Sequence, residues 1–262
     1  MGLLKKIFRK FFKKKNKKDQ WFIALKYRTK NLFNLKNLTI IHAPKGHFWA
    51  DPFVIEHQKR HFIFFEDHDY VKANIGVAEL KGLELINPRT IIKEKTHISF
   101  PAVFKLEKDF FMTIESIKEK KLYIYKAIKF PDQWKKYSIV ARGQFVDPVI
   151  KKTTKGFEIW ASEGSNRLKV FHSKTINGPW KVIRDEEKKY ARSAGHFIRD
   201  IRPVQDCTST YGGAIKLIKN DKVIKTIKPN WAPNITGTHT FNFNSKYVVI
   251  DGKRPYQHKI EI

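Results

Sequence analysis

The sequence predicts an all-β protein, a five-bladed β-propeller preceded by a short basic amphipathic N-terminal helix. Beyond residue 37 the chain consists of short segments rich in Ile, Val, Phe, Tyr and Trp, separated by turns of Gly, Asn, Asp and Lys, which is the pattern of β-strands. One motif recurs five times at a nearly constant spacing. Long stripes of helical period are scarce outside the first eighteen residues.

The first eighteen residues, MGLLKKIFRKFFKKKNKK, contain nine basic residues and no acidic one. Their Leu, Ile and Phe residues recur at helical spacing, which predicts a helix with one apolar stripe and one cationic face. Such a helix is typical of a segment that lies on an anionic membrane surface. The alternative is a disordered basic tail that binds nothing in particular or binds RNA. The candidate membrane-binding residues are Leu4, Lys5, Phe8, Arg9, Phe11 and Phe12.

Lys and Arg interrupt every apolar pair of this segment, so it does not have the continuous apolar region of a secretory signal. No run in the chain reaches the roughly 18 apolar residues of a transmembrane helix. The lone Cys207 excludes an internal disulfide and every multi-cysteine metal site, which is compatible with a reducing compartment. We therefore expect a cytoplasmic protein, peripheral on the inner face of the cell membrane.

The recurring motif joins a small or acidic residue to an apolar strand, a polar turn and a second apolar strand. It is clearest at residues 48–66, FWADPFVIEHQKRHFIFFE, and is echoed at 97–116, 144–163, 193–206 and 237–252. A period of this size in an all-β sequence is typical of a propeller with one four-stranded blade per repeat. We expect the residues that open each echo to face one another around a central channel. The anchors, which lie 49, 47, 47 and 44 residues apart, are Pro52, Pro101, Pro148, Gly195 and His239.

The chain has 262 residues, enough for one large domain with a sizeable core. We predict an anchor helix over 1–18, a connector with outer strands over 19–44, and the propeller over 45–262. The 53 Lys and Arg outnumber the 25 Asp and Glu, giving a net charge of +28, which favours anionic partners. Part of this excess can equally be a solvated surface. Lys predominates over Arg, which disfavours specific nucleic-acid readout.

Several motifs together resemble a known family. They are FWADPFVIE with HFIFFE, HISFPAVF with TIES, FPDQW, FVDPVI, NGPW, RPVQDCTSTYGGA and GTHTFN. In this order, over roughly residues 45–252, they resemble the N-terminal domain family named after plant glucosamine inositolphosphorylceramide transferases. The resemblance implies a carbohydrate-active or carbohydrate-binding propeller related in shape to glycoside hydrolase families 43 and 32. The transferase activity of the plant proteins is attributed to another domain, which we expect this chain to lack.

Acidic residues near the starts and ends of the predicted inner strands are the candidate catalytic groups. Glycosyl transfer and hydrolysis both commonly use two carboxyl groups, one protonated and one ionised. By resemblance to family 43, Asp51 is the base, Asp147 tunes the acid, and Glu115 is the candidate acid. Crowding among these acids would raise their pKa values. The alternative is that Asp51 and Asp147 are strand-entry residues whose carboxylates bond nearby backbone amides.

Further polar residues are candidates for substrate binding, each with a structural alternative. Glu66 faces the predicted channel or belongs to a solvated acidic rim with Asp67 and Asp69. Arg202 grips an anionic group or pairs with Asp206. The histidines that open the second and fifth echoes hold ligand or are hydrogen-bonded wall residues. Trp49, Trp160 and Trp231 stack on sugar rings or pack in the core. The substrate-binding candidates are Glu66, His97, Arg202, Gln205, Asp206, Tyr211 and His239.

Four functions stay open. The leading hypothesis is glycosyl transfer onto a lipid-linked or surface glycan, with a sugar or glycan and an anionic membrane as partners. The second is a hydrolase or phosphorylase that resembles family 43 and uses Asp51 and Glu115. The third is a non-catalytic glycan-binding or scaffold propeller, and the fourth is nucleic-acid binding through the excess charge. No metal or cofactor is predicted, and a central divalent cation is unsupported by any metal motif.

Overall fold

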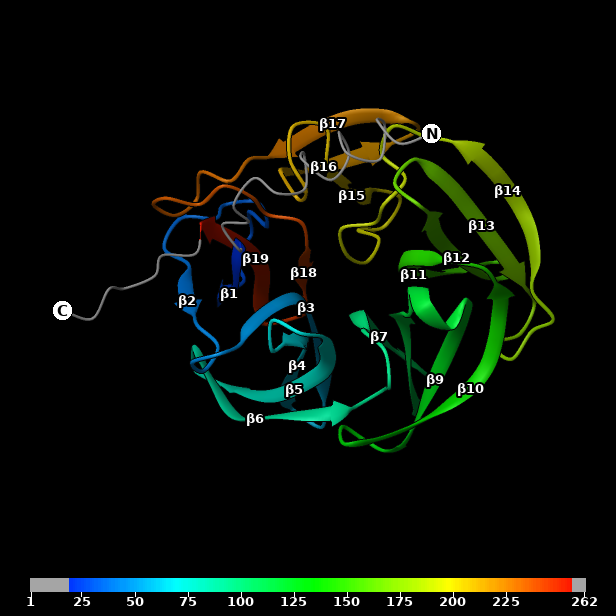
Figure 1. Cartoon of the computed structure of the whole chain (residues 1–262), viewed down its shortest axis with the longest axis horizontal. Coiled ribbons are helices and arrows are strands. Elements are labelled where there is room, and N and C mark those ends of the chain that lie inside the picture. Colours follow the sequence, from blue (N-terminus) through cyan, green and yellow to red (C-terminus); the bar gives the residue numbers. More distant parts are fainter. Residues whose placement is uncertain (1–18, 256–262) are drawn as a thin grey trace, which may run out of the picture.

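The computed structural model describes residues 19–255, which form five antiparallel sheets arranged around a central axis (Figure 1). Each sheet is one blade. Within the described residues, four blades have four strands each, and blade IV has three. The predicted all-β, five-bladed propeller is thus confirmed. The predicted N-terminal helix, with all six candidate membrane-binding residues, lies outside the described residues.

Blades I to III are each built from four consecutive strands, in line with the predicted repeat. In blade I the strands are β3 (Phe48–His57), β4 (Arg60–His68), β5 (Ala73–Lys81) and β6 (Glu84–Ile92). In blade II they are β7 (Ser99–Leu106), β8 (Asp109–Glu115), β9 (Lys121–Lys129) and β10 (Gln133–Arg142). In blade III they are β11 (Phe145–Thr153), β12 (Gly156–Glu163), β13 (Arg167–Ser173) and β14 (Lys181–Glu187).

Tight turns set the register of these hairpins. Gln58 and Lys59 connect β3 to β4, and both have positive φ, 49° and 62°. Two consecutive positive-φ residues are the mark of a hairpin turn whose twist matches that of the flanking strands. Asn220 and Asp221 form the same kind of turn in blade IV, with φ of 48° and 59°. Asn and Asp are the side chains that tolerate this conformation best.

Blade IV contains β15 (Arg202–Asp206), β16 (Ala214–Lys219) and β17 (Lys222–Ile227). An irregular segment completes its inner edge: Ser193 forms an isolated bridge with Val204. The backbone N–H of Ala194 donates to the Pro203 carbonyl at 3.0 Å, and the Gln205 N–H donates to the Arg192 carbonyl at 3.0 Å. The innermost position of blade IV is therefore taken by residues 192–194, not by β15.

Blade V joins the two ends of the described chain. Its strand order is β18 (Phe241–Phe243), β19 (Tyr247–Pro255), β1 (Asp19–Tyr27) and β2 (Thr39–Ile41). The β1–β19 ladder is continuous from the Asp19–Pro255 pair to the Tyr27–Tyr247 pair. Residues 19–44, predicted to be a connector with outer strands, thus supply two strands of this blade. This pairing closes the ring of blades.

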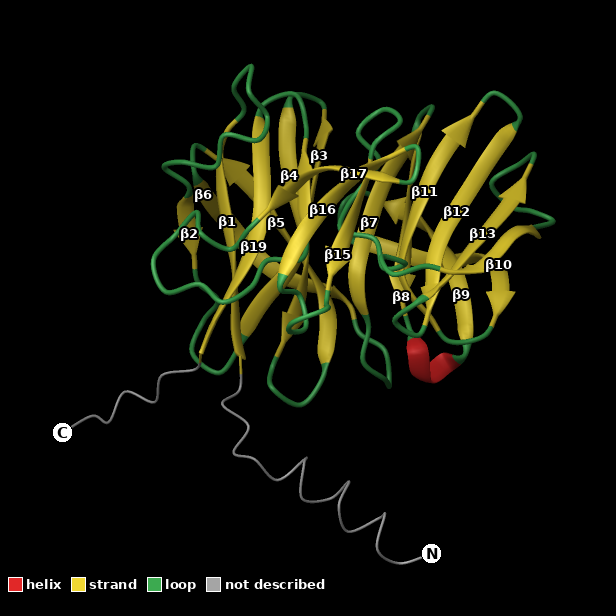
Figure 2. Ribbon diagram, turned by 90° about the horizontal axis from the view of Figure 1, so that it is seen from above, coloured by secondary structure: helices red, strands yellow, loops and turns green. Residues whose placement is uncertain are grey.

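Hydrophobic clusters pack between neighbouring blades. One cluster joins Phe53, Phe100 and Val149 of blades I, II and III, and another joins Phe22 and Ile215 of blades V and IV. The single helical turn in residues 19–255, η1 (Ile117–Glu119), lies at one end of the propeller (Figure 2). Within this range, no helix is long and apolar enough to cross a membrane.

A strained bulge recurs where the inner strands of blades I to III begin. Asp51, Phe100 and Asp147 have φ of 51°, 54° and 49°, each precedes a proline, and the ladder register shifts across each of them. Such bulges re-aim a side chain and are common beside functional sites. In blade IV the matching anchor is Gly195, with φ of 129°, where a Cβ would lie 2.1 Å from the Phe241 carbonyl oxygen.

Candidate active site

A small cavity of about 190 Å³ lies at one end of the propeller and receives residues from all five blades. It is smaller than the roughly 300–1,000 Å³ pockets that hold drug-sized ligands, so it suits one sugar-sized group. Its lining is Trp21, Phe48, Asp51, Glu66, His68, His97, Ser99, Glu115, Asp147, Arg192, Tyr211 and His239. The sequence-predicted members of this set are Asp51, Glu66, His97, Glu115, Asp147, Tyr211 and His239.

The bulge at Asp51 brings a buried carboxylate to the cavity wall. Its backbone N–H donates to Asp251 Oδ2 at 3.2 Å, and Thr240 Oγ1 donates to Asp51 Oδ1 at 2.6 Å. Burial raises the pKa of Asp51 to about 6, with the neighbouring Asp251 and Asp147 charges adding to burial and His239 opposing it. Asp51 is therefore largely ionised at neutral pH yet close to its titration point.

His239 is held against Asp51 by a buried network. Its Nδ1 lies 2.5 Å from Asp251 Oδ2 and 3.7 Å from Asp51 Oδ1. Asp251 also accepts the backbone N–H groups of His239 and Thr240, at 2.8 and 2.9 Å. Trp21 stacks on the imidazole with ring centroids 3.8 Å apart. Burial lowers the pKa of His239, but the carboxylates of Asp251 and Asp51 outweigh burial and leave the pKa raised.

The Asp147 bulge carries a different set of partners. Its backbone N–H donates to Glu115 Oε2 at 3.2 Å. Arg192 grips its carboxylate with two nitrogens, Nε to Oδ2 at 2.5 Å and Nη2 to Oδ1 at 3.3 Å. Arg192 Nη2 also lies 4.0 Å from Glu115 Oε2. Burial and the Asp147 charge raise the pKa of Glu115 to about 8, although Arg192 opposes them.

These contacts differ from the ones that the strand-entry alternative predicts for the two bulge aspartates. The carboxylates of Asp51 and Asp147 accept from the side chains of Thr240 and Arg192, not from the backbone amides that a strand-entry role requires. Instead their own backbone N–H groups are bound by acidic side chains of neighbouring strands. Both carboxylates are thus presented to the cavity.

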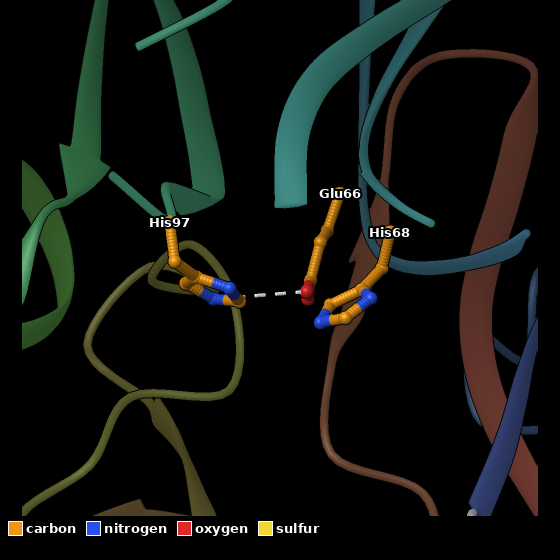
Figure 3. Close-up of side chains that lie close together, drawn as sticks. All are labelled: Glu66, His68 and His97. Atoms are coloured by element: carbon orange, nitrogen blue, oxygen red, sulfur yellow. Dashed lines mark ion pairs between the residues drawn. The ribbon is translucent and has the colours of Figure 1, made fainter. Parts of the chain in front are cut away.

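Glu66 is a buried cavity residue and not part of a solvated rim. Burial, followed by the charges of Asp51 and Glu115, raises its pKa well above the ordinary value. His97 Nε2 lies 3.8 Å from Glu66 Oε1, and His68 lies on the other side of the carboxyl group (Figure 3). The neighbouring Asp67 has a structural role instead, because it accepts from Trp49 Nε1 at 3.1 Å.

One group at the axis has the residue types of a cation site, namely Asp51, His239 and Asp251, whose candidate ligand atoms lie within 4.8 Å of one another. The short contact from His239 Nδ1 to Asp251 Oδ2 places a proton between these atoms. That nitrogen therefore has no lone pair to offer, so His239 could bind a cation only through its other ring nitrogen, Nε2.

Three predicted substrate-binding residues lie outside the cavity lining and make structural contacts. Arg202 donates to the carbonyls of Tyr190 and Ala191 at 2.7 and 3.0 Å. Gln205 Nε2 donates to the Ser193 carbonyl at 3.0 Å. Asp206 pairs with Lys216 at 3.3 Å, so the proposed Arg202–Asp206 pair is replaced by other partners. The contacts of Arg202 and Gln205 hold the segment that carries Arg192.

Sequence reasoning missed Arg192, Trp21, His68 and Asp251. Arg192 follows Asp147 by 45 residues, so the repeat period was a signal that could have found it. Trp21 and Asp251 come close to the acids of the other blades only because β1 pairs with β19 in blade V. Of the two roles predicted for the tryptophans, the structure shows packing in the core. Trp49, Trp160 and Trp231 all lie in or against hydrophobic clusters.

The chain is similar to known proteins in sequence and in fold. The family model described as "Glucosamine inositolphosphorylceramide transferase 1, N-terminal" matches residues 28–231. Glucosamine inositolphosphorylceramide transferase 1 of Oryza sativa subsp. japonica is 30% identical over 201 residues, which cover 69% of this chain and 27% of the rice protein. The Arabidopsis thaliana protein of that name is 26% identical over 201 residues, with 69% and 26% covered. The chain thus spans about a quarter of these relatives.

Solved structures with similar folds come from glycoside hydrolases. A family 117 glycoside hydrolase, Zg3597 of Zobellia galactanivorans, has a TM-score of 0.56 at 9% identity, covering 92% of this chain and 93% of that one. The α-L-arabinofuranosidase PaAbf62A of Podospora anserina has a TM-score of 0.57 at 9% identity, covering 82% and 94%. At these identities the likeness is one of fold alone.

Proposed function

Because the chain belongs to the family of glucosamine inositolphosphorylceramide transferase 1 N-terminal domains, we propose that it is a carbohydrate-active propeller that transfers a sugar onto a lipid-linked or surface glycan at the cytoplasmic face of a membrane. One observation carries this proposal. A sugar-sized cavity holds two carboxyl groups whose pKa values lie on either side of neutrality, about 6 for Asp51 and about 8 for Glu115.

The two carboxyl groups divide the work of acid–base catalysis. At neutral pH Glu115 is mostly protonated and can give its proton to the oxygen that leaves the sugar. Asp51 is mostly ionised and can accept the proton of the attacking hydroxyl. Pairs of titratable groups whose environments separate their pKa values are the usual basis of such assignments. The acceptor in the leading proposal is a glycan hydroxyl.

Burial and the charge of Asp147 keep Glu115 in its protonated form. The Asp147 carboxylate raises the pKa of Glu115, whereas Arg192 partly offsets this effect. Since the Asp147 N–H also binds Glu115 Oε2 at 3.2 Å, the bulge fixes the orientation of the acid as well as its protonation state. Asp147 therefore acts in this proposal as a positioning and tuning residue.

The membrane part of the proposal rests on the composition of residues 1–18 and on where they join the propeller. β1 begins at Asp19, and Trp21, two residues further on, lines the cavity. Asp19 is bound by Lys253 Nζ at 2.9 Å, and this amine lies 5.6 Å from the centre of the Trp21 ring. A basic segment attached here would bind the membrane on the side where the cavity lies.

A transfer assay with product separation tests the catalytic proposal. The full chain is incubated with anionic vesicles carrying a lipid-linked glycan acceptor and with radiolabelled, nucleotide-activated glucosamine or N-acetylglucosamine. We expect label in the lipid phase, with its appearance lost in Asp51→Asn and Glu115→Gln. Label that stays entirely on the nucleotide with every acceptor would contradict the proposal.

Hydrolysis by the same two carboxyl groups is the second candidate, because an acid and a base placed around one sugar act equally well on water. In the same assay, free labelled sugar that disappears in Asp51→Asn would favour hydrolysis. A third candidate, a non-catalytic glycan-binding propeller, predicts bound glycan with neither product. In that case Asp51→Asn and Glu115→Gln would leave biological activity intact.

Vesicle flotation tests the membrane proposal separately. We expect the full chain to float with anionic vesicles, and we expect flotation to be lost when Phe8, Phe11 and Phe12 are replaced by Ser. The matched control replaces the exposed Val182 and Ile183 of β14 by Ser, which should leave flotation unchanged. Unchanged flotation of the triple Phe variant would refute an amphipathic anchor.

A further inference from the structure

One part of the cavity wall is formed by Glu66, His68 and His97, called here the Glu66 triad. Glu66 and His68 lie two residues apart on β4, so their side chains share one face of the strand. His97 comes from the segment between β6 and β7. One atom from each residue lies within 4.8 Å of the others, and both rings turn toward the carboxyl group (Figure 3).

Two histidines and one carboxylate are the ligand set of many transition-metal sites. A histidine that binds a metal through one nitrogen almost always donates the N–H of its other nitrogen to an oxygen atom. The Glu66 triad has the opposite arrangement. His68 Nδ1 accepts the Tyr70 backbone N–H at 2.8 Å, and His97 Nδ1 accepts the Ala73 backbone N–H at 3.2 Å.

The backbone therefore fixes the tautomer of both rings. A neutral imidazole whose Nδ1 accepts a hydrogen bond carries its proton on Nε2. Both rings are neutral near pH 7, because burial lowers the pKa of His68 to about 4 and also lowers that of His97. Each histidine thus presents an Nε2–H donor, and neither offers Nε2 as a metal ligand.

An anionic ligand is also disfavoured at the triad. Asp51 and Asp147 line the same cavity as Glu66, and their carboxylates would repel a phosphate placed beside the triad. The group that suits the triad is neutral and can both accept and donate a hydrogen bond. A hydroxyl group has this property.

The spacing within the triad leaves room for such a group. His97 Nε2 and Glu66 Oε1 are 3.8 Å apart, which is longer than the roughly 2.7–3.2 Å of a direct hydrogen bond. A hydroxyl oxygen beside the two can accept from the histidine N–H and donate to the Glu66 oxygen. Phe48 stacks on His68 with ring centroids 4.5 Å apart and supplies an apolar wall next to the polar groups.

We propose that the Glu66 triad is a subsite for hydroxyl groups of a sugar ring, with His68 and His97 as hydrogen-bond donors and Glu66 as acceptor. This inference rests on the proposed carbohydrate function and names the group that the cavity recognises. The triad selects sugars by the hydroxyls they present, and it takes no metal ion.

The tautomers test the inference without any assay of catalysis. In ¹⁵N-labelled full chain, long-range proton–nitrogen correlation spectra distinguish Nε2–H from Nδ1–H histidines. We expect Nε2–H for both His68 and His97 at pH 7, and we expect no change of these signals when Zn²⁺ is added. An Nδ1–H tautomer in either ring, or a stoichiometric zinc-dependent shift of both, would overturn the subsite in favour of a metal site.

Binding of simple sugars tests the ligand class. The probes are the methyl glycosides of glucose, galactose, mannose and N-acetylglucosamine, followed by singly deoxygenated analogues of the tightest binder. We expect one deoxygenation to weaken binding to the unchanged protein by about two- to tenfold, the usual worth of one hydrogen bond. The same deoxygenation should have little effect on His97→Leu. Failure of every glycoside to perturb His68 or His97 would overturn the inference.

A conservative variant distinguishes hydrogen-bond donation by His97 from other properties of its imidazole ring. His97→Gln keeps an N–H donor near the position of Nε2, so it should bind the chosen glycoside several-fold more tightly than His97→Leu. Equal losses in the two variants would contradict a donor role. The His97 side chain is 38% exposed, and unchanged near-ultraviolet circular dichroism would confirm that both variants fold. Because these readouts measure binding, a protein that binds sugars but shows no turnover would fail the transfer proposal and keep the subsite.

Discussion

The two Asp-Pro bulges of the cavity share a backbone design and differ in what surrounds their carboxylates. In both, the aspartate has positive φ and its N–H donates to an acidic side chain at 3.2 Å, Asp251 for Asp51 and Glu115 for Asp147. The Asp51 carboxylate is bound by the neutral Thr240 hydroxyl. The Asp147 carboxylate is bound by the guanidinium of Arg192.

This difference assigns distinct roles to similar residues. A full cation fixes the Asp147 carboxylate as a charge that acts on its neighbours. Asp51 keeps a raised pKa of about 6 and is free to exchange its proton near neutral pH. Equivalent positions in a repeated fold can therefore supply a reactive base on one side and a fixed charge on the other. Four substitutions test this difference between the two aspartates.

Asp51→Asn should have the largest effect on activity. Loss of a general base commonly costs about 10²–10⁴ in rate, so we expect the turnover of the labelled sugar donor to fall by this factor. Folding stability should change by only about 1 kcal/mol, since the Thr240 hydroxyl and the Asp251 carboxylate can still bind the amide and the backbone. Asp109, which pairs with Lys126 and is not among the residues that line this cavity, provides the matched control Asp109→Asn, which should keep full activity. Retention of most activity in Asp51→Asn would remove it as the base.

Arg192→Met should have the largest effect on stability. The substitution leaves the buried Asp147 carboxylate unpaired, which typically costs about 3–5 kcal/mol. Urea denaturation at pH 7 measures the loss. The double variant Arg192→Met with Asp147→Leu should recover part of it, because no buried charge is then left alone. A loss below about 1 kcal/mol for the single variant would show that the pair does not hold the cavity together.

Glu115→Gln should lower activity and should raise folding stability, relative to the unchanged protein, at high pH. The folded-state pKa of Glu115 is about 8, whereas an unfolded glutamate titrates near about 4.3. Between these values only the unfolded chain releases the proton, so this group's contribution to stability is lost as pH rises toward 8, by up to about 1.4 kcal/mol per pH unit.

Gln does not titrate and can still accept the Asp147 N–H. Relative to the unchanged protein, we therefore expect Glu115→Gln to become progressively more stable between pH 5 and pH 8 in parallel denaturation experiments. The same stability difference at both pH values would show that Glu115 has an ordinary pKa.

Thr240→Val should have the smallest effect and the most specific one. The Thr240 hydroxyl favours the ionised form of Asp51, so its loss should raise the pKa of Asp51, by up to about one unit. The midpoint of the acidic limb of the pH–rate profile should move to higher pH by the same amount. In the matched control Thr113→Val, the lost hydroxyl binds the Pro148 carbonyl at 2.6 Å beside the Asp147 bulge. That control should lower stability without moving the limb.

Much of this architecture could be predicted from the sequence because it is encoded by local repeats. The period of the Asp-Pro and Ser-Phe-Pro steps located the inner strands, and the acids near those steps met in one cavity. The irregular inner edge of blade IV broke the pattern. Residues 192–194 occupy the place that the polar stretch around Arg202 was expected to take, so Arg202, Gln205 and Asp206 lie behind the cavity wall.

Contacts made by closure of the ring could not be read from local patterns. Trp21 and Asp251 are separated by almost the whole chain and come together because β1 pairs with β19. The charge balance around each aspartate depends on such contacts. The repeat could indicate that acids gather at the axis, but only the fold decides which acid meets Arg192 and which meets a hydroxyl.

The carboxyl titrations of Asp51 and Glu115 test the division of roles most directly. Carbon-13 spectra of the labelled full chain, recorded from pH 4 to pH 9 and assigned with Asp51→Asn and Glu115→Gln, would follow both groups in one sample. We expect midpoints near 6 for Asp51 and near 8 for Glu115. If both groups titrated near about 4, as ordinary exposed carboxyls do, the cavity would hold no acid–base pair at neutral pH and the proposed chemistry would be wrong.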